Sequence, residues 1–444
     1  MSHINTNQQR KFYLKTLGCQ MNEHDSEVIA GILARLGYVQ TEECTEADLI
    51  LYNTCSVREN PERKVYGQIT SLKQLKDKNP GLLIGICGCM PQQKEELEKL
   101  LARLPHVDLI FGTHNIHRLP ELLERAQTEE RVVEVWDDSQ EVVEDLPAIR
   151  ANKFKAFVNV IYGCNNFCSY CVVPYTRGRE RSRSPKDILK EVRQLADEGY
   201  KEVTLLGQNV NTYGADLDEK TSFAELLSLI NDVPGVERIR FTTSHPKDMQ
   251  DELIEAIANL PKVCEHLHLP VQTGSDRILK LMNRHYTSAY YLDLVAKIRE
   301  AVPEINLTTD LIVGFPGETE EDFQDTLRLV EAVRFSSAFT FIYSPRPGTP
   351  AAKMADQVPE DVKKERVYRL IDLQNRISLE YMQAQLGKTE EVLVDELAAK
   401  TGELSGRTRT NKQVLFSGPS DLLGKLVQVK ITEAKTWSLR GVMA

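Results

Sequence analysis

The sequence contains no long apolar segment, no excess of basic residues and no internal repeat. Nowhere do about 18 apolar residues follow one another, so we expect no membrane span. The polar residues 1–10 lack the apolar centre of a signal peptide and are better interpreted as a loose tail. The net charge of -10 argues against a protein that coats nucleic acid nonspecifically, but it allows a local basic patch.

What the sequence does contain is typical of a multidomain globular protein. Its 444 residues exceed one ordinary core, and 41% of them are hydrophobic while 27% are charged. Nine cysteines, an odd number without an export signal, favour a reducing compartment and metal or redox chemistry over structural disulfides. We therefore expect a cytoplasmic protein.

From residue 11 to about residue 136, short apolar segments alternate with amphipathic helical ones. The expected strands are 12–17, 49–52, 82–86, 108–111 and 131–135. Helices are expected between them, for example at 26–36 and 95–104. Strict alternation predicts a doubly wound parallel sheet with helices on both faces.

Two further regions follow the acidic residues 137–147, which are expected to form a linker. Within residues 150–378, the expected strands are 157–161, 203–206, 239–242, 266–269, 305–313 and 339–343. Six such units predict an open, partial (β/α)6 barrel rather than a closed eight-stranded one. Residues 380–444 contain strand-like runs at 391–396, 413–416 and 426–432 with turn signals between them, including Ser405-Gly406. Short strands separated by turns predict a small antiparallel β-barrel.

Three cysteines, Cys164, Cys168 and Cys171, lie close together immediately after the first strand of the second region. Thiolates at such short spacing favour an iron-sulfur cluster or zinc. A 4Fe-4S cube has four irons, so three thiolates leave one iron open for a chelating cofactor. A structural zinc site would need a fourth ligand, and the nearest histidine is His245. We favour the cluster, with zinc or incidental thiols as alternatives.

Cys19, Cys55 and Cys89 are far apart in sequence, yet each follows an expected strand of the first region. The carboxyl ends of neighbouring parallel strands meet at one edge, which would bring these thiols together. We therefore expect a second three-cysteine cluster, with buried structural cysteines as the alternative. Cys87 is better interpreted as core, and Cys44 and Cys264 as ordinary thiols.

The C-x3-C-x2-C loop, with Tyr170 before its last cysteine, resembles the radical S-adenosylmethionine (SAM) superfamily. The resemblance implies that the open iron binds SAM, which one electron cleaves to a 5′-deoxyadenosyl radical. Contacts with SAM are then expected at positions that match the motifs of that superfamily, namely Tyr170, Gly207, Gln208, Gln272, Val313 and Gly314. The segment 311–318 has a second interpretation, in which Gly-Phe-Pro-Gly is simply the turn that ends an apolar strand.

Four segments, 16–22, 53–58, 88–90 and 171–178, resemble the methylthiotransferases, and the carboxy-terminal region is similar to their TRAM domain. Residues 22–27 and 175–183 look most like the MiaB branch, which adds a methylthio group to carbon 2 of isopentenyladenosine beside the anticodon of tRNA. The resemblance implies two 4Fe-4S clusters, with all six cysteines as ligands and catalytic residues. Relatives that modify another tRNA adenosine or an aspartate of a ribosomal protein remain alternatives, as does a two-cluster electron carrier.

The partners implied by the resemblance are a tRNA anticodon stem-loop, an electron donor and a sulfur source. Two groups of basic residues are candidates for phosphate contacts. The first comprises Arg177, Arg179, Arg181 and Arg183, and the second Arg407, Arg409, Lys412, Lys430, Lys435 and Arg440, with Trp437 as a stacking residue. Each group could equally be ordinary surface charge.

Overall fold

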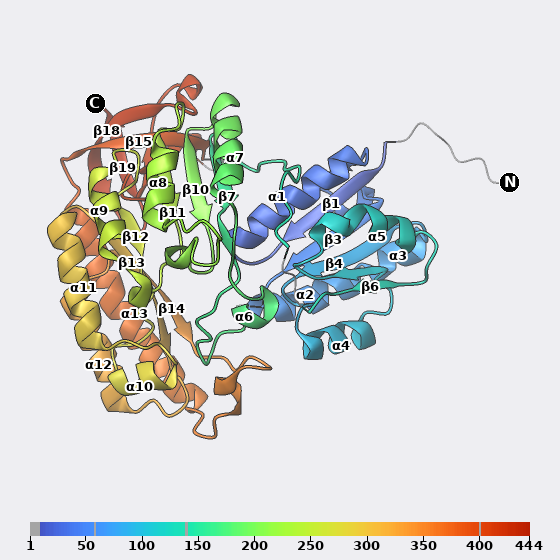
Figure 1. Ribbon diagram of the computed structural model, residues 1–444, viewed down its shortest axis with the longest axis horizontal. Helices are drawn as coiled ribbons and strands as arrows, with labels where there is room; N and C mark the ends of the chain where they lie inside the picture. The colour runs from blue at the N-terminus through green and yellow to red at the C-terminus, as the bar shows by residue number, and fades with distance from the viewer. Residues whose placement is uncertain (1–8, 57–58, 138–140, 399–400) are drawn as a thin grey trace. The chain divides into compact units, whose positions relative to one another are not determined.

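The computed structural model describes residues 9–56, 59–137, 141–398 and 401–444, except for the side chains of 59–64 (Figure 1). The expectations for residues 1–8, for Val57 and Arg58 and for 138–140 fall outside this part. The chain forms two compact units, of which the first extends to Ala151 and also contains Tyr162–Asn165 and Cys171–Arg181. The remaining residues form the second unit. In the described part, no helix is long and apolar enough to cross a membrane.

The first unit is built on a six-stranded sheet in the order β2-β1-β3-β4-β5-β6, in which every pair is parallel. Its strands are β1 (Lys11–Thr16), β2 (Val39–Gln40), β3 (Leu49–Thr54), β4 (Leu83–Gly88), β5 (Leu109–Phe111) and β6 (Val132–Glu134). The helices are α1 (Gln20–Arg35), α2 (Glu59–Ser71), α3 (Lys73–Lys78), α4 (Lys94–Arg103) and α5 (Leu119–Ala126). The expected parallel sheet is confirmed, although the two-residue strand β2 was not predicted.

Both faces of this sheet are covered, because successive strand residues point to opposite sides. Leu49 and Leu51 of β3 pack with α1 and α5, whereas Ile50 and Tyr52 pack with α2 and α4. Cys87 lies in the first of these clusters, so its interpretation as a core residue is confirmed.

The expected linker is bound to the first unit. Leu146 and Ala148 pack against the cluster that contains α1. The Arg150 guanidinium lies 2.9 Å from the Glu27 carboxylate, and the Ile149 N–H donates to the Glu27 carbonyl. Residues 141–151 contain no helix or strand, but their hydrogen bonds and apolar contacts hold them on α1.

The second unit contains six parallel strands in two three-stranded sheets. They are β7 (Lys155–Asn159), β10 (Glu202–Leu206), β11 (Arg238–Phe241), β12 (His266–His268), β13 (Asn306–Val313) and β14 (Ser337–Ile342). A parallel bridge between Ile239 and Val263 joins the two sheets. The expected partial barrel is thus confirmed.

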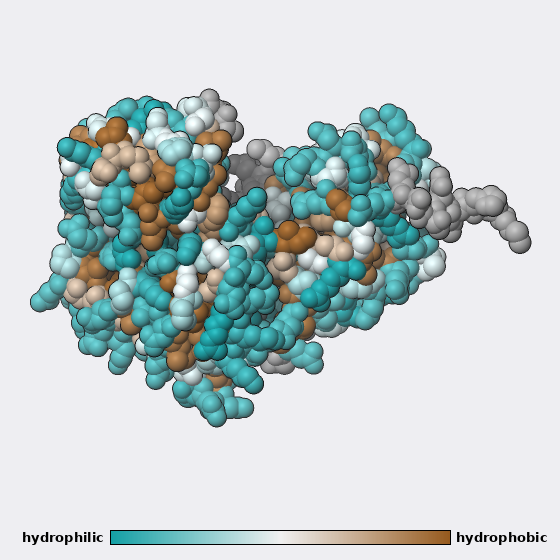
Figure 2. Space-filling model, turned by 90° about the horizontal axis from the view of Figure 1, so that it is seen from above, coloured by the Kyte–Doolittle hydropathy of each residue, from teal (hydrophilic) through white to brown (hydrophobic). Residues whose placement is uncertain are grey.

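Helices surround this barrel and share one large apolar core with the outward faces of its strands (Figure 1). They are α7 (Pro185–Asp197), α8 (Phe223–Asn231), α9 (Asp251–Asn259), α11 (Ser288–Ala301), α12 (Glu320–Val333) and α13 (Glu360–Gln383). The short helix α10 (Asp276–Leu281) also belongs to the second unit, whereas α6 (Val173–Thr176) belongs to the first. The residues of β8 (Ile161–Tyr162) and β9 (Arg181–Ser182) divide between the two units. Figure 2 shows hydrophilic side chains over most of the visible face, with apolar ones interspersed.

The carboxy-terminal region is a closed barrel in the order β15-β16-β17-β19-β18. Its strands are β15 (Thr389–Leu397), β16 (Leu404–Thr408), β17 (Gln413–Phe416), β18 (Leu426–Ala434) and β19 (Leu439–Met443). Four of the neighbouring pairs are antiparallel, but β17 and β19 are parallel, which the expectation of a purely antiparallel barrel missed. The interpretation of Ser405-Gly406 as a turn was wrong, because both residues lie within β16. A Cβ at Gly406 would lie 2.3 Å from the Leu393 carbonyl oxygen, so glycine serves close strand packing there.

This small barrel is tied to the amino-terminal ends of the larger barrel's strands. Three buried side chains of β11 and β13 donate to carbonyl groups at the end of β16 and in the turn that follows it. These bonds run from Arg238 to Arg407, from Arg240 to Thr408 and Arg409, and from Asn306 to Thr410. The bonds measure between 2.6 and 2.8 Å. The turn between β16 and β17 therefore serves as an attachment to the larger barrel.

Candidate functional site

Cys19, Cys55 and Cys89 meet at the carboxyl edge of the first sheet. β1, β3 and β4 are adjacent, Cys55 and Cys89 directly follow β3 and β4, and Cys19 lies just before α1. The Sγ atoms of Cys19 and Cys89 lie 3.7 and 4.0 Å from the same atom, Asn22 Oδ1. A Cβ placed on Gly18, the neighbour of Cys19, would lie 3.1 Å from Cys55 Sγ. The structure thus gathers the three thiols that the sequence pattern grouped.

Two glycines bring the backbone close to these thiols. Gly18 has a φ of +136° and Gly88 a φ of +94°, which L side chains rarely adopt. A Cβ at Gly18 would lie 2.6 Å from Cys55 Cβ, and one at Gly88 would lie 2.4 Å from the Thr54 carbonyl oxygen. The thiol edge therefore depends on glycine at both positions.

Asn22 fixes the polar environment of the thiols. Its Nδ2 donates to the carbonyl oxygens of Thr54 at 2.9 Å and Leu17 at 3.2 Å and to Asn53 Oδ1 at 3.2 Å. With the amide nitrogen held by three acceptors, Oδ1 is directed toward Cys19 and Cys89. Asn22 ends the segment 16–22 that resembles the methylthiotransferases, but the sequence alone indicates no role for it.

Arg177 is a buried cation beside this edge, and its interpretation as a phosphate contact was wrong. Its Nη2 lies 2.7 Å from Asp25 Oδ2 and 2.9 Å from Asn22 Oδ1. Burial lowers the pKa of Arg177, but Asp25, Cys89 and Cys19 raise that pKa well above its ordinary value. Burial raises the pKa of the Cys89 thiol, and Arg177 opposes this effect. The guanidinium therefore stays charged, and it partly offsets the effect of burial on the pKa of Cys89.

The thiol edge fits a bulky inorganic centre. Ser56 directly follows Cys55, and its buried hydroxyl has no hydrogen-bond partner in the described part of the chain. Both polar side-chain atoms of Gln93, four residues after Cys89, are also buried and have no hydrogen-bond partner among the described residues. Three soft thiol donors, glycine-lined backbone and polar atoms available for a ligand match the requirements of an iron-sulfur cluster.

The second set, Cys164, Cys168 and Cys171, lies in one short loop whose residues divide between the two units. In the first unit, the Cys164 N–H donates to the Gly178 carbonyl at 3.1 Å. In the second unit, the buried Cys168 Sγ accepts from Arg284 Nη1 at 3.6 Å. A backbone bond within the first unit thus holds Cys164, and a cation within the second unit contacts Cys168.

Asn283 and Arg284, which the sequence did not identify, position the Cys168 part of this loop. Asn283 Nδ2 donates to the carbonyl groups of Asn166 at 3.3 Å and Phe167 at 3.1 Å. Phe167 itself has a φ of +46°, which these bonds help to maintain. The only available signal was an Asn-Arg pair after a short helix, which is too common to indicate a site.

Among the described residues, no group of three or more His, Cys, Asp or Glu side chains is arranged to hold one metal ion. The three thiolates of a cube bind three different irons, so they need not converge on a single point.

The residues expected to contact SAM all lie at the carboxyl ends of the second unit's strands or in the cysteine loop. Tyr170 and Gln208 are half-buried, Gln272 is buried with a φ of +73°, and a Cβ at Gly207 would lie 2.4 Å from Ile161 Cγ2. The Val313 side chain is fully buried, and the Gly314 N–H donates to Glu318 Oε1 at 2.9 Å. Contacts within the protein thus account in part for the residue types of Val313 and Gly314. The contacts of both residues with SAM stay predictions.

Three further side chains on the inner face of the barrel were missed. His268, Asp310 and Phe339 belong to neighbouring strands, and the alternate residues of these strands pack in the outer core. His268 Nε2 lies 3.5 Å from Asp310 Oδ1, and the His268 and Phe339 rings are 6.2 Å apart. The Phe339 side chain is 56% exposed, which is unusual for a barrel strand. This face combines a histidine–carboxylate contact with an accessible apolar ring.

Most of the basic residues expected to contact RNA have partners within the protein. Arg183 is buried and donates to Glu191 at 2.6 Å, Arg409 lies 2.7 Å from Glu265, and Lys412 is buried. Arg440 pairs with Glu403 at 2.9 Å. The exposed candidates in the small barrel are Lys430, Lys435 and Trp437.

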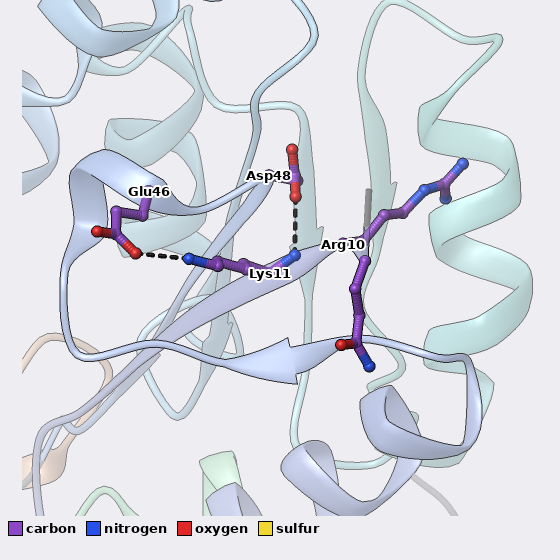
Figure 3. A pocket seen from close by; sticks show the side chains of 5 residues that line it. Arg10, Lys11, Glu46 and Asp48 are labelled. Atoms are coloured by element: carbon purple, nitrogen blue, oxygen red, sulfur yellow. Dashed lines mark hydrogen bonds and ion pairs between the residues drawn. The ribbon is translucent and has the colours of Figure 1, made fainter. Parts of the chain in front are cut away.

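Two cavities of the first unit lie apart from the thiols. One, of about 320 Å³, is lined by Gln9, Arg10, Lys11, Glu46 and Asp48 at the amino-terminal end of β1 (Figure 3). Among the lining residues, Lys11 pairs with Glu46 at 2.6 Å, and the Lys11 N–H donates to Asp48 at 2.7 Å. The other, of about 80 Å³, is lined by His24, Asp25, His114 and Arg181 among others. Neither contains one of the six cysteines.

Comparisons with known proteins cover nearly the whole chain. Residues 11–112 match Uncharacterized protein family UPF0004, residues 158–330 the Radical SAM superfamily and residues 383–444 the TRAM domain. A tRNA-2-methylthio-N(6)-dimethylallyladenosine synthase of Acetivibrio thermocellus is 58% identical over 99% of this chain and 92% of its own length. The protein of that name from Carboxydothermus hydrogenoformans is 58% identical over 98% and 99%.

Solved structures of lower identity share the fold. The radical SAM methyltransferase TsrM from Kitasatospora setae, with tryptophan and a SAM analogue bound, has a TM-score of 0.57 at 16% identity and covers 77% of this chain and 75% of its own. The cobalamin-dependent SAM radical enzyme OxsB has a TM-score of 0.52 at 14% identity, with coverage of 83% and 56%.

Proposed function

This chain belongs to the family of tRNA-2-methylthio-N(6)-dimethylallyladenosine synthases, and we propose from its structure how it performs their reaction. It adds a methylthio group to carbon 2 of the adenine in isopentenyladenosine beside the anticodon of tRNA. The observation that carries this function is the presence of two separate three-cysteine sets in one chain. Each supplies one ligand fewer than a cube has irons, which favours an enzyme over an electron carrier.

The Radical SAM match implies one 4Fe-4S cluster and SAM, held by Cys164, Cys168 and Cys171. We infer a second 4Fe-4S cluster at Cys19, Cys55 and Cys89. When bound, the cluster at Cys164, Cys168 and Cys171 with SAM supplies a carbon-centred radical that removes an unactivated hydrogen, and the cluster at Cys19, Cys55 and Cys89 supplies sulfur. Arg284 and Arg177 are the cations that this chain places beside the thiolates of the two sets.

The inner face of the barrel offers a place for the modified base. Phe339 is accessible and apolar, which suits the isopentenyl group. Asp310 can accept a hydrogen bond from the N–H that carries this group, and His268 holds the Asp310 carboxylate in place. The Asp310 side chain is 27% exposed, so a ligand can reach it. These residues hold and orient the base, while hydrogen removal belongs to the radical.

The remaining partners follow from the same reaction. One electron is needed to cleave SAM and a sulfur atom is consumed, so the chain needs an electron donor and a sulfur source. In the TRAM region, the exposed Trp437 with Lys430 and Lys435 can contact the anticodon stem-loop by stacking and charge. Thiols that must stay reduced favour the cytoplasm as the compartment of this reaction.

The test is an anaerobic reaction of the reconstituted protein with an anticodon stem-loop that carries isopentenyladenosine. Nucleoside mass spectrometry should detect the methylthio product with SAM, reductant and sulfide present. The same RNA with unmodified adenosine and a ribosomal-protein peptide with the target aspartate serve as competing substrates. Product on the peptide, or equal product on unmodified RNA, would show that the substrate assignment is wrong.

A further inference from the structure

Arg177 reaches the thiol edge of the first unit from a different segment than the cysteines do. It follows α6, whose last residue, Thr176, accepts a hydrogen bond from Thr113 Oγ1 at 2.7 Å. The side chain is only 5% exposed, and Nη2 contacts both Asn22 and Asp25 of α1. The guanidinium is therefore fixed by two side chains of α1, and Thr113 holds the segment that carries it.

This cation lies next to the candidate ligand sulfurs. Arg177 Nη2 lies 2.9 Å from Asn22 Oδ1, and Cys19 Sγ lies 3.7 Å from the same oxygen atom. Asn22 Oδ1 accepts a hydrogen bond from Arg177 and also lies 4.0 Å from Cys89 Sγ, so the same oxygen atom contacts the cation and the thiol. The positive charge is thus in the immediate surroundings of two of the three thiols.

A buried ion pair is a poor device for stability alone. Removing both charges from water costs about as much as their attraction returns, and apolar side chains would close the same space at no such cost. A fixed charge does have a consequence for a centre that gains an electron. A buried cation favours the more negative, reduced form, and a buried carboxylate disfavours it.

We propose that the Arg177–Asp25 pair sets the reduction potential of the centre held by Cys19, Cys55 and Cys89. Arg177 raises the potential and Asp25 lowers it, so the two charges oppose each other across 2.7 Å. Both are positioning residues that act through the cluster. This inference rests on the proposed function to the extent that a cluster is bound at these cysteines.

The experiment uses the full-length protein with Cys164, Cys168 and Cys171 changed to Ala, so that one centre remains. Its reduction by dithionite is followed by electron paramagnetic resonance at a series of poised potentials. At the parent midpoint, Arg177→Met should lower the reduced-to-oxidised ratio about tenfold, which is about 59 mV for one electron. Asp25→Asn should raise that ratio, and Arg177→Lys, which keeps the charge, should change it less than Arg177→Met does.

Arg183→Met is the matched control, because Arg183 is a buried arginine of the same segment whose partner is Glu191. It should leave the midpoint at the parent value. Unchanged midpoints in both Arg177→Met and Asp25→Asn, or shifts in the same direction, would overturn the inference. If Arg177→Met binds no iron, Asp25→Asn decides alone. If the parent itself binds no iron at these cysteines, the second cluster of the proposed function fails instead.

Discussion

The two cysteine sets of this chain reach their places by opposite routes. Cys164, Cys168 and Cys171 are near neighbours in one loop, so their grouping follows from chain connectivity. Cys19, Cys55 and Cys89 are separated by more than thirty residues at each step, and only the order of β1, β3 and β4 in the sheet joins them. A loop site can survive local changes in the sheet, whereas a site built by topology depends on the whole unit.

The largest expected effect separates the roles of the two sets. Cys168→Ala should lower the rate of SAM cleavage about a thousandfold or more, because no open iron then binds the cofactor. Cys19→Ala should spare abortive SAM cleavage while eliminating sulfur insertion. Iron analysis should give about eight irons per chain for the parent and about four for either variant. Cys264→Ala, outside both sets, is the control, and loss of cleavage in Cys19→Ala would contradict this division.

Arg284→Leu sharpens the comparison at the loop. It removes the hydrogen bond to Cys168 Sγ, and loss of such an outer partner typically costs about 10- to 100-fold in cluster affinity or activity. SAM cleavage should fall accordingly, while the iron bound by the first set stays constant. Arg284→Lys should recover part of the activity because it keeps the charge. Equal loss of iron from both sets would show general unfolding instead.

Gly18→Ala tests the topological site by a single methyl group. The new Cβ would meet Cys55 Cβ at 2.6 Å, in a backbone with φ of +136°, so we expect destabilisation of about 2 kcal/mol or more and loss of iron from the first set. Gly37→Ala is the matched control, because its φ is +84° but nothing lies within 4 Å of the new Cβ. Gly37→Ala should lower the free energy of unfolding by about 1 kcal/mol and leave the iron content unchanged. Thermal unfolding and iron content measure both.

The sequence predicted those parts of the molecule that depend on local pattern. The alternation of strands and helices predicted both parallel arrangements, and a cysteine after each strand predicted the thiol edge, because parallel strands share a carboxyl edge. The positions of charged side chains were harder to predict from the sequence. Arg177 and Arg183 look like surface residues in a basic run, but tertiary partners bury both of them.

Other features required tertiary contacts that no short pattern reveals. Gly406 lies in a strand, although serine followed by glycine is typical of a turn. Glycine is needed at this position because Leu393 of β15 approaches its backbone closely. His268, Asp310 and Phe339 come together only through the register of three strands. Long-range pairing therefore determines which single residues of an ordinary strand become part of a site.

The smallest expected difference compares the two asparagines that support the sets. Asn22→Ala removes the side-chain donor of the buried Thr54 carbonyl, which still accepts from the Cys89 N–H. It should lower the free energy of unfolding by about 1 to 2 kcal/mol and release iron from the first set. Asn283→Gly keeps the backbone at φ of +61° and loses only bonds to loop carbonyls, so we expect about 1 kcal/mol. Asn411→Gly, at φ of +63° in the small barrel, controls for the glycine itself. If Asn283→Gly proves the more costly change in chemical denaturation, the loop set depends on its surroundings more than the topological set does, and the contrast between the two sites is reversed.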